Sequence, residues 1–84
     1  MKYNKSETPT IIKKQLSHMG WMLRDYRWDQ FLTLKEAQDQ CGLHFRTISR
    51  IERGESVTLV SLLRYMRFLG LEISDIMPND EDLE

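Results

Sequence analysis

Residues 33–55, TLKEAQDQCGLHFRTISRIERGE, carry the strongest structural signal in the sequence. It predicts two helices joined by a tight turn at Gly42, because glycine takes positive φ angles at which other residues clash. Thr33 is a good N-cap for the first helix, and Glu36 stands three residues later, as a capping box requires. The second helix is expected over about residues 44–53.

The second helix has an apolar side and a basic side. At about 100° per residue, Ile48 and Ile51 point one way. The residues that point the other way are Arg46, Ser49, Arg50 and Arg53. The major groove of DNA admits one α-helix, and arginine bonds a guanine edge or clamps a phosphate. The pattern therefore predicts DNA binding. The alternative is a solvated cationic face on an ordinary helical hairpin.

The segment GLHFRTISRIERGE, residues 42–55, resembles the core of the Xre/Cro-like helix-turn-helix repressor family. Upstream, MGWMLRDYR (19–27) is similar to the first helix of that family. Downstream, TLVSLLRYMRFLGLEISDIM (58–77) is similar to its fourth and fifth helices. The likeness covers residues 19–77 without a gap. It implies an all-α, five-helix, lambda-repressor-like DNA-binding domain with a helix-turn-helix.

Three features depart from the family pattern. Gln38 stands where an alanine is usual, so either the neighbouring Ala37 compensates through a small rotation or Gln38 forms a local hydrogen bond. Phe31 occupies a position where a glycine often ends the first helix. His44 and Phe45 open the recognition helix where small polar residues are common, which leaves the base preference open.

The helical periodicity of residues 44–53 and the family resemblance together predict which residues contact DNA. The expected base contacts are His44, Phe45, Arg46, Ser49 and Arg50. Arg46 and Arg50 are the preferred base readers, and Phe45 is expected to pack on a thymine methyl group. Phosphate contacts are expected from Thr33 and Lys35, because helix N-termini attract phosphate, and from Arg53 at the end of its helix.

Length and composition predict one small cytoplasmic domain. The chain has 84 residues, of which 40% are hydrophobic. No apolar run approaches the roughly 20 residues that span a bilayer, and the start of the chain lacks an apolar signal-peptide core. Cys41 is the single cysteine, which excludes an internal disulfide and predicts a buried thiol. We expect a prokaryotic or phage-encoded protein, associated with the nucleoid when bound to DNA.

Charge divides the chain into a basic body and an acidic end. Residues 1–70 hold all twelve Lys and Arg against seven acids, whereas residues 71–84 hold six acids and no base. The expected domains are a flexible arm (1–9), a helix-turn-helix domain (10–77) and an acidic tail (78–84), of which residues 79–84 are expected to be disordered. The arm either reaches along a DNA groove or is simply a disordered terminus.

Residues from Thr10 to about Gln30 predict a long first helix. Its apolar stripe consists of Ile12, Leu16, Met19, Leu23 and Tyr26. Gly20 inside this helix suggests a close neighbour. Trp21 and Trp28 lie almost opposite the stripe, and interface centres are enriched in Trp. They therefore predict a protein-partner face, unless the helix bends or frays and the rings fold into the core.

The C-terminal part predicts a fourth helix over residues 59–69 and a short fifth helix near 73–77, which ends before Pro78. The residues expected to supply core from the fourth helix are Leu59, Leu62, Leu63, Met66 and Leu69. In relatives this end of the domain commonly forms the dimer contact, which would fall here on Leu71, Ile73 and Ile76.

Catalysis finds little support in the sequence. His18, His44 and Cys41 lack metal-ligand spacing, and no Gly-rich phosphate loop follows a strand pattern. We therefore expect a non-enzymatic protein without cofactor or metal. The predicted function is a sequence-specific transcriptional regulator, most simply a repressor. It would bind a palindromic site on double-stranded DNA as a homodimer, with recognition helices about 34 Å apart. The alternatives are the antitoxin of a toxin–antitoxin pair and the controller protein of a restriction–modification system.

Overall fold

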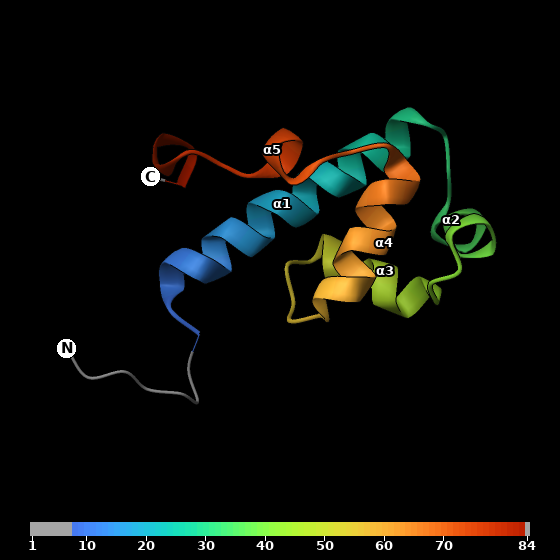
Figure 1. The fold of residues 1–84 in the computed structure, drawn as a ribbon, viewed down its shortest axis with the longest axis horizontal. Coiled ribbons are helices and arrows are strands. Elements are labelled where there is room, and N and C mark those ends of the chain that lie inside the picture. Colours follow the sequence, from blue (N-terminus) through green and yellow to red (C-terminus); the bar gives the residue numbers. More distant parts are fainter. Residues whose placement is uncertain (1–7, 84) are drawn as a thin grey trace.

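A computed structural model describes residues 8–83 of the chain. These residues form five α-helices and a terminal 3₁₀ turn, without a strand (Figure 1). The elements are α1 (Thr10–Asp29), α2 (Leu34–Cys41), α3 (Phe45–Glu52), α4 (Leu59–Leu69), α5 (Ile73–Ile76) and η1 (Asp80–Leu83). The predicted all-α, five-helix architecture is confirmed. Most of the predicted arm, residues 1–7, lies outside the described residues. None of the described helices combines the length and the apolar character needed to cross a membrane.

The long helix α1 is the support on which the other elements pack. Helices α2, α3 and α4 gather around its C-terminal half, whereas η1 lies beside its N-terminal half (Figure 1). The core lies between α1 and the four helices α2 to α5. Its buried hydrophobic residues are Met19, Leu23, Ala37, Ile48, Ile51, Tyr65, Met66, Leu69 and Ile76.

The apolar stripe of α1 is buried in its middle and exposed at its start. Met19 and Leu23 are buried, as predicted, but 42% of Ile12 is exposed because the first turns extend beyond the packed body. Gly20 lies where α1 meets the end of α3. A Cβ atom at Gly20 would lie 2.5 Å from the carbonyl oxygens of both Ile51 and Glu52. The predicted close neighbour is therefore the backbone of the recognition helix.

Helix α4 is rotated relative to its predicted core face. Leu59 and Leu63 are 64% and 47% exposed, so assigning them to the core was wrong. Met66 and Leu69 are buried as predicted, and Leu62 packs partly buried against the core, whereas the buried Tyr65 was not among the predicted core residues. A buried tyrosine usually needs a hydrogen-bond partner for its hydroxyl, and the Glu52 carboxylate of α3 is the partner of Tyr65 here. This partner is on another helix, so the sequence pattern of α4 alone favoured the leucines.

The acidic end of the chain is folded where the structure describes it, so the predicted disorder of the tail is wrong for residues 79–83. Leu83 is buried, and η1 packs against α1. The Asn79 amide donates to Asp82 Oδ2 at 3.0 Å, and Lys14 Nζ donates to the Leu83 carbonyl at 3.5 Å. The buried Leu83 and the hydrogen bond from Lys14 thus tie this short acidic segment to α1.

Candidate nucleic-acid interface

The first helix of the motif begins with the predicted capping box. Thr33 Oγ1 accepts from the Glu36 amide at 3.1 Å, and Glu36 Oε1 accepts from the Thr33 amide at 3.1 Å. These contacts lower the pKa of Glu36. The hydrogen bond with the Thr33 backbone has the larger effect, and the one with the Thr33 side chain has the smaller. Thr33 and Lys35 are exposed at the start of α2. The amides of Leu34 and Lys35 belong to a first helical turn, where no intrahelical acceptor exists.

The turn between α2 and α3 explains two of the unusual residues. Gly42 ends α2 with φ of 79°. Gln38 Oε1 accepts from the Phe45 amide at 2.8 Å, so the hydrogen-bonding alternative for Gln38 is the one realised. His44 is the N-cap of α3, and its Nδ1 accepts from the Arg46 amide at 3.1 Å. These two side chains satisfy amides at the start of α3 and fix its direction.

Phe31 is the third departure, and its backbone behaves as the missing glycine would. Its φ is 57°, and it is the single non-glycine residue with positive φ among those described. Its side chain is 91% exposed. The turn between α1 and α2 therefore places a non-glycine residue in a left-handed conformation, which is unfavourable, and the exposed ring adds no core packing in return.

The recognition helix α3 has the predicted buried and exposed sides. Ile48 and Ile51 are 0% and 3% exposed, whereas Arg46, Arg50 and Arg53 face solvent. The other expected contacts lie at its N-terminal end or on its flank. Phe45 and Ser49 are half-buried there and His44 is exposed. The rings of His44 and Phe45 stack with centroids 4.6 Å apart.

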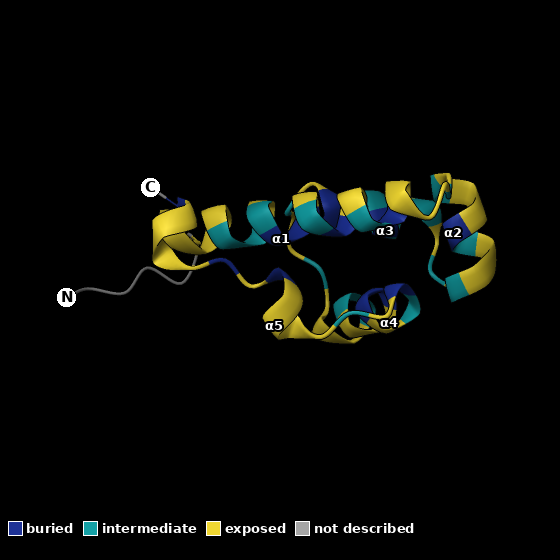
Figure 2. Ribbon diagram, turned by 90° about the horizontal axis from the view of Figure 1, so that it is seen from above, coloured by how far each residue is buried: buried dark blue, intermediate teal, exposed yellow. Residues whose placement is uncertain are grey.

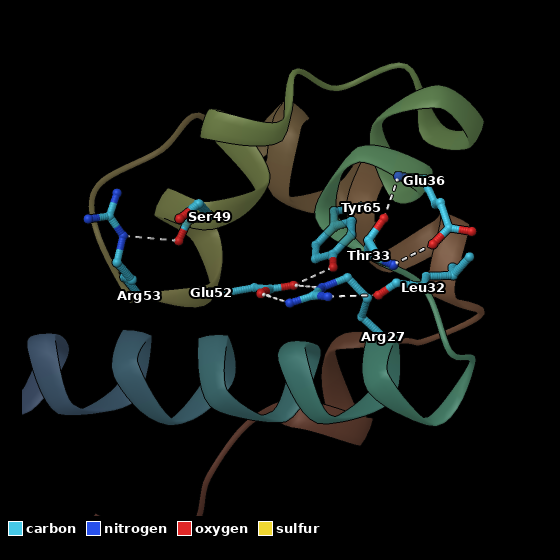
Figure 3. A network of polar contacts seen from close by, with 8 residues as sticks. All are labelled: Arg27, Leu32, Thr33, Glu36, Ser49, Glu52, Arg53 and Tyr65. Carbon is cyan, nitrogen blue, oxygen red and sulfur yellow. Dashed lines mark hydrogen bonds and ion pairs between the residues drawn. The ribbon is translucent and has the colours of Figure 1, made fainter.

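A buried ion pair fixes α3 against α1. Arg27 Nε and Nη2 each donate to the Glu52 carboxylate at 2.8 Å, and Arg27 Nη1 donates to the Leu32 carbonyl at 2.8 Å (Figure 3). Tyr65 from α4 donates its hydroxyl to Glu52 Oε2 at 2.5 Å. The hydrogen bond to Glu52 raises the pKa of Arg27, while burial raises that of Tyr65. Three helices thus meet at one carboxylate.

Sequence reasoning missed this network, although part of its signal was available. Arg27 lies one turn beyond Leu23 on the core side of α1, and Glu52 adjoins Ile51 on the buried side of α3. A charged residue at a core position needs a partner, because an isolated buried charge is very costly. Two such positions of opposite sign suggest a pair. Which residues meet depends on how the helices cross, and a single sequence does not show this.

Two of the three arginines on α3 are turned toward the loop between α3 and α4. Arg50 Nη2 donates to the Ser56 carbonyl at 2.9 Å, and Arg50 Nε lies 3.6 Å from Glu55 Oε1. Arg53 Nη2 lies 3.0 Å from Glu55 Oε2. Arg46 has no ion-pair partner among the described residues. These exposed pairs are weak, so Arg50 and Arg53 can exchange Glu55 for a nucleic acid at little cost.

The tryptophans of α1 are on the surface, so the alternative in which they fold into the core is wrong. Trp21 and Trp28 are each 55% exposed. The guanidinium carbon of Arg24 lies 4.5 Å from the centroid of the Trp28 ring. Trp28 and Arg24 border a cleft whose other side is formed by Ser49 and Arg53 of α3. This part of the exposed side of α1 therefore adjoins the recognition helix.

A family model described as helix-turn-helix matches residues 23–76. The chain belongs to the Xre/Cro-like helix-turn-helix family. Its fold is similar to the crystal structure of the clp gene regulator ClgR from C. glutamicum, at 26% identity and a TM-score of 0.62. That match covers 86% of this chain and 88% of the other. Curated protein sequences gave no match. Family membership makes the chain a DNA-binding transcriptional regulator.

Proposed function

We propose that this helix-turn-helix protein represses transcription as a homodimer that reads a palindromic operator through α3. The observation that carries the proposal is the recognition helix itself. Its apolar side is buried, three arginines line its exposed side, and the Arg27–Glu52 pair locks its C-terminal end to α1. A helix held this rigidly can enter a major groove without ordering on binding. Occupancy of a promoter would then exclude the polymerase.

The proposed contacts divide into base readers and phosphate contacts. The base readers are His44, Phe45, Arg46, Ser49 and Arg50. Among them Arg46 is the first choice, because it is exposed and has no ion pair to release. Thr33, Lys35 and Arg53 are the proposed phosphate contacts, at the start of α2 and the end of α3. Phosphate contacts set position, whereas base contacts set sequence preference.

The proposed dimer surface lies on α4 and α5, which are on the same side of α1 (Figure 2). Ile73 is 47% exposed and Leu71 is half-buried, so both remain in the proposal. Ile76 is withdrawn, because it is 1% exposed and belongs to the core of a single chain. Leu59 and Leu63 of α4 are also exposed and offer further apolar area for such a contact. Ile73→Asp should shift the sedimentation coefficient toward the monomer if this surface pairs two chains.

Selection of bound duplexes from a random DNA pool at about 0.15 M salt tests the proposed function. Enrichment of a two-fold symmetric motif is expected, with half-sites about one helical turn apart, since a symmetric dimer reads two equivalent half-sites. Enrichment of an asymmetric single half-site would contradict the homodimer. Failure of a folded protein to enrich any sequence would contradict base-specific binding.

A second candidate is an antitoxin that binds DNA and also neutralises a protein partner. The exposed Trp21 and Trp28 favour it, because large aromatic side chains on a surface are typical of protein interfaces. Expression of the neighbouring gene alone and together with this chain tests the idea. Toxicity that this chain relieves, with co-purification of the two proteins, is expected of an antitoxin. A harmless neighbour that does not co-purify would contradict it.

A further inference from the structure

Helices α1 and α3 form a cleft beside the proposed DNA-reading surface, and none of the proposed base readers except Ser49 lies in it. Arg24 and Trp28 come from α1, Ser49 and Arg53 from α3, and Leu34 from the start of α2. The cleft encloses about 270 Å³. Since a water molecule occupies about 30 Å³ in the liquid, the cleft has room for several waters, and so for a phosphodiester group with a few bound waters.

The charge of the cleft selects an anion. Arg27 and Glu52 both line the cleft, and their opposite charges cancel. The Glu52 carboxylate already accepts hydrogen bonds from Arg27 and Tyr65. Glu52 is the single carboxylate among the described lining residues. The remaining charges are the guanidinium groups of Arg24 and Arg53, on opposite walls. Both are exposed, so water reaches them and a ligand can as well.

Trp28 restricts where the Arg24 charge can lie. The guanidinium carbon of Arg24 is 4.5 Å from the ring centroid, a favourable cation–π distance. The ring limits the freedom of a long side chain, so less entropy remains to be lost when Arg24 binds a ligand. Arg53 is held more loosely. It donates to the Ser49 carbonyl at 3.4 Å (Figure 3), and its Nη2 lies 3.0 Å from Glu55 Oε2.

We propose that this cleft seats one phosphate of the DNA backbone, bound by Arg24 and Arg53, with Trp28 as a positioning residue for Arg24. The proposal rests on the proposed function, because the cleft is continuous with the DNA-reading side of α3 through Ser49 and Arg53. This continuity and the paired guanidinium groups favour DNA over a protein occupant. Leu34, the first residue of α2, also lines this cleft.

The salt dependence of DNA binding tests the phosphate site. Wild-type protein and Arg24→Gln are titrated against a fluorescein-labelled duplex of the selected site and against a scrambled duplex, from about 50 to 200 mM salt. Arg24→Gln should weaken binding to both duplexes by the same factor, about 3–10-fold. The slope of log affinity against log salt should fall by about 0.9, as expected when one phosphate contact is lost.

Arg67→Gln is the matched control, because Arg67 is an exposed arginine on α4 that does not line the cleft. It removes the same charge and should leave the slope unchanged. Trp28→Leu should weaken binding by about 2–5-fold in wild-type protein, and by little in the Arg24→Gln background. That non-additivity is specific to a ring that acts through Arg24.

The outcomes separate the two proposals. If the wild type binds its selected site and Arg24→Gln has the same slope as Arg67→Gln, the phosphate site is overturned while the proposed function stands. In that case the Trp28 side of α1 is available to a protein partner. If Arg24→Gln weakens only the selected site, Arg24 reads a base and the phosphate assignment is wrong. If the wild type binds neither duplex, both proposals fall.

Discussion

At the scale of single residues, Tyr65 shows how a polar group is kept in this core. Its side chain is fully buried, and its hydroxyl donates to the Glu52 carboxylate that also binds Arg27. Removing one member of a buried ionic network leaves the others short of partners. The sequence showed Tyr65 as one apolar residue among many on α4, because its partner lies on another helix.

Tyr65→Phe should lower the free energy of unfolding by about 1.5–3 kcal/mol at neutral pH, the range for a hydrogen bond to a charged group. Burial raises the pKa of Tyr65, so the folded state holds its proton more tightly than the unfolded state. This contribution is complete below the unfolded pKa of about 10 and is lost as pH rises above it. The stability gap between wild type and Tyr65→Phe should therefore narrow above that pH. Urea unfolding at several pH values measures the gap, and a constant gap would contradict a raised pKa.

Phe31 combines a left-handed backbone conformation with an exposed ring. A left-handed conformation costs a residue with a side chain about 1–2 kcal/mol, whereas glycine adopts it readily. Because 91% of the Phe31 side chain is exposed, little burial is lost on its removal. We expect Phe31→Gly to raise the free energy of unfolding by about 0.5–1 kcal/mol, after the greater entropy of glycine in the unfolded chain is deducted. A lower melting temperature in this variant would show that the ring packs against the protein in solution.

At the scale of elements, sequence patterns predicted the helices well where local chemistry decides them. The capping box at Thr33 and the glycine at Gly42 set the limits of α2. The two sides of α3 followed from helical periodicity. The face of α4 was wrong in part, and the order of the acidic end was missed. In both places a contact with a distant element decides the outcome, and periodicity within one segment does not contain it.

Gly20 is where two elements meet most closely. In an isolated helix, Gly20→Ala would be stabilising by about 1 kcal/mol. Here the new Cβ would lie 2.5 Å from two carbonyl oxygens of α3, and backbone atoms cannot move aside as a flexible side chain can. Overpacking of this kind costs about 1–3 kcal/mol or more, so we expect a net loss of stability in thermal unfolding. A melting temperature that rises would contradict the close packing of α1 on α3.

At the scale of the whole molecule, α1 organises both stability and recognition. Its buried side holds α3 through Gly20 and Arg27, and its exposed side carries Arg24 and Trp28 along the same recognition helix. The sequence left the exposure of the two tryptophans as one of two alternatives and did not reveal their neighbours. Whether an exposed position adjoins the interface depends on the packing of α1 against α3, which the chain order does not reveal. The proposed protein-partner face and the proposed phosphate cleft therefore meet at Trp28.

Base reading by α3 in a symmetric pair of chains is a property of the whole dimer, and the sequence of the bound DNA tests it. Selection from a random duplex pool is repeated with Arg46→Ala, and the motif is compared with that of the wild type. The substitution removes the exposed arginine without an ion pair and should cost about 1–3 kcal/mol on the wild-type site. We expect preference to be lost at one base position in each half-site and kept elsewhere. An unchanged motif, or equal weakening on every sequence, would contradict base reading by Arg46.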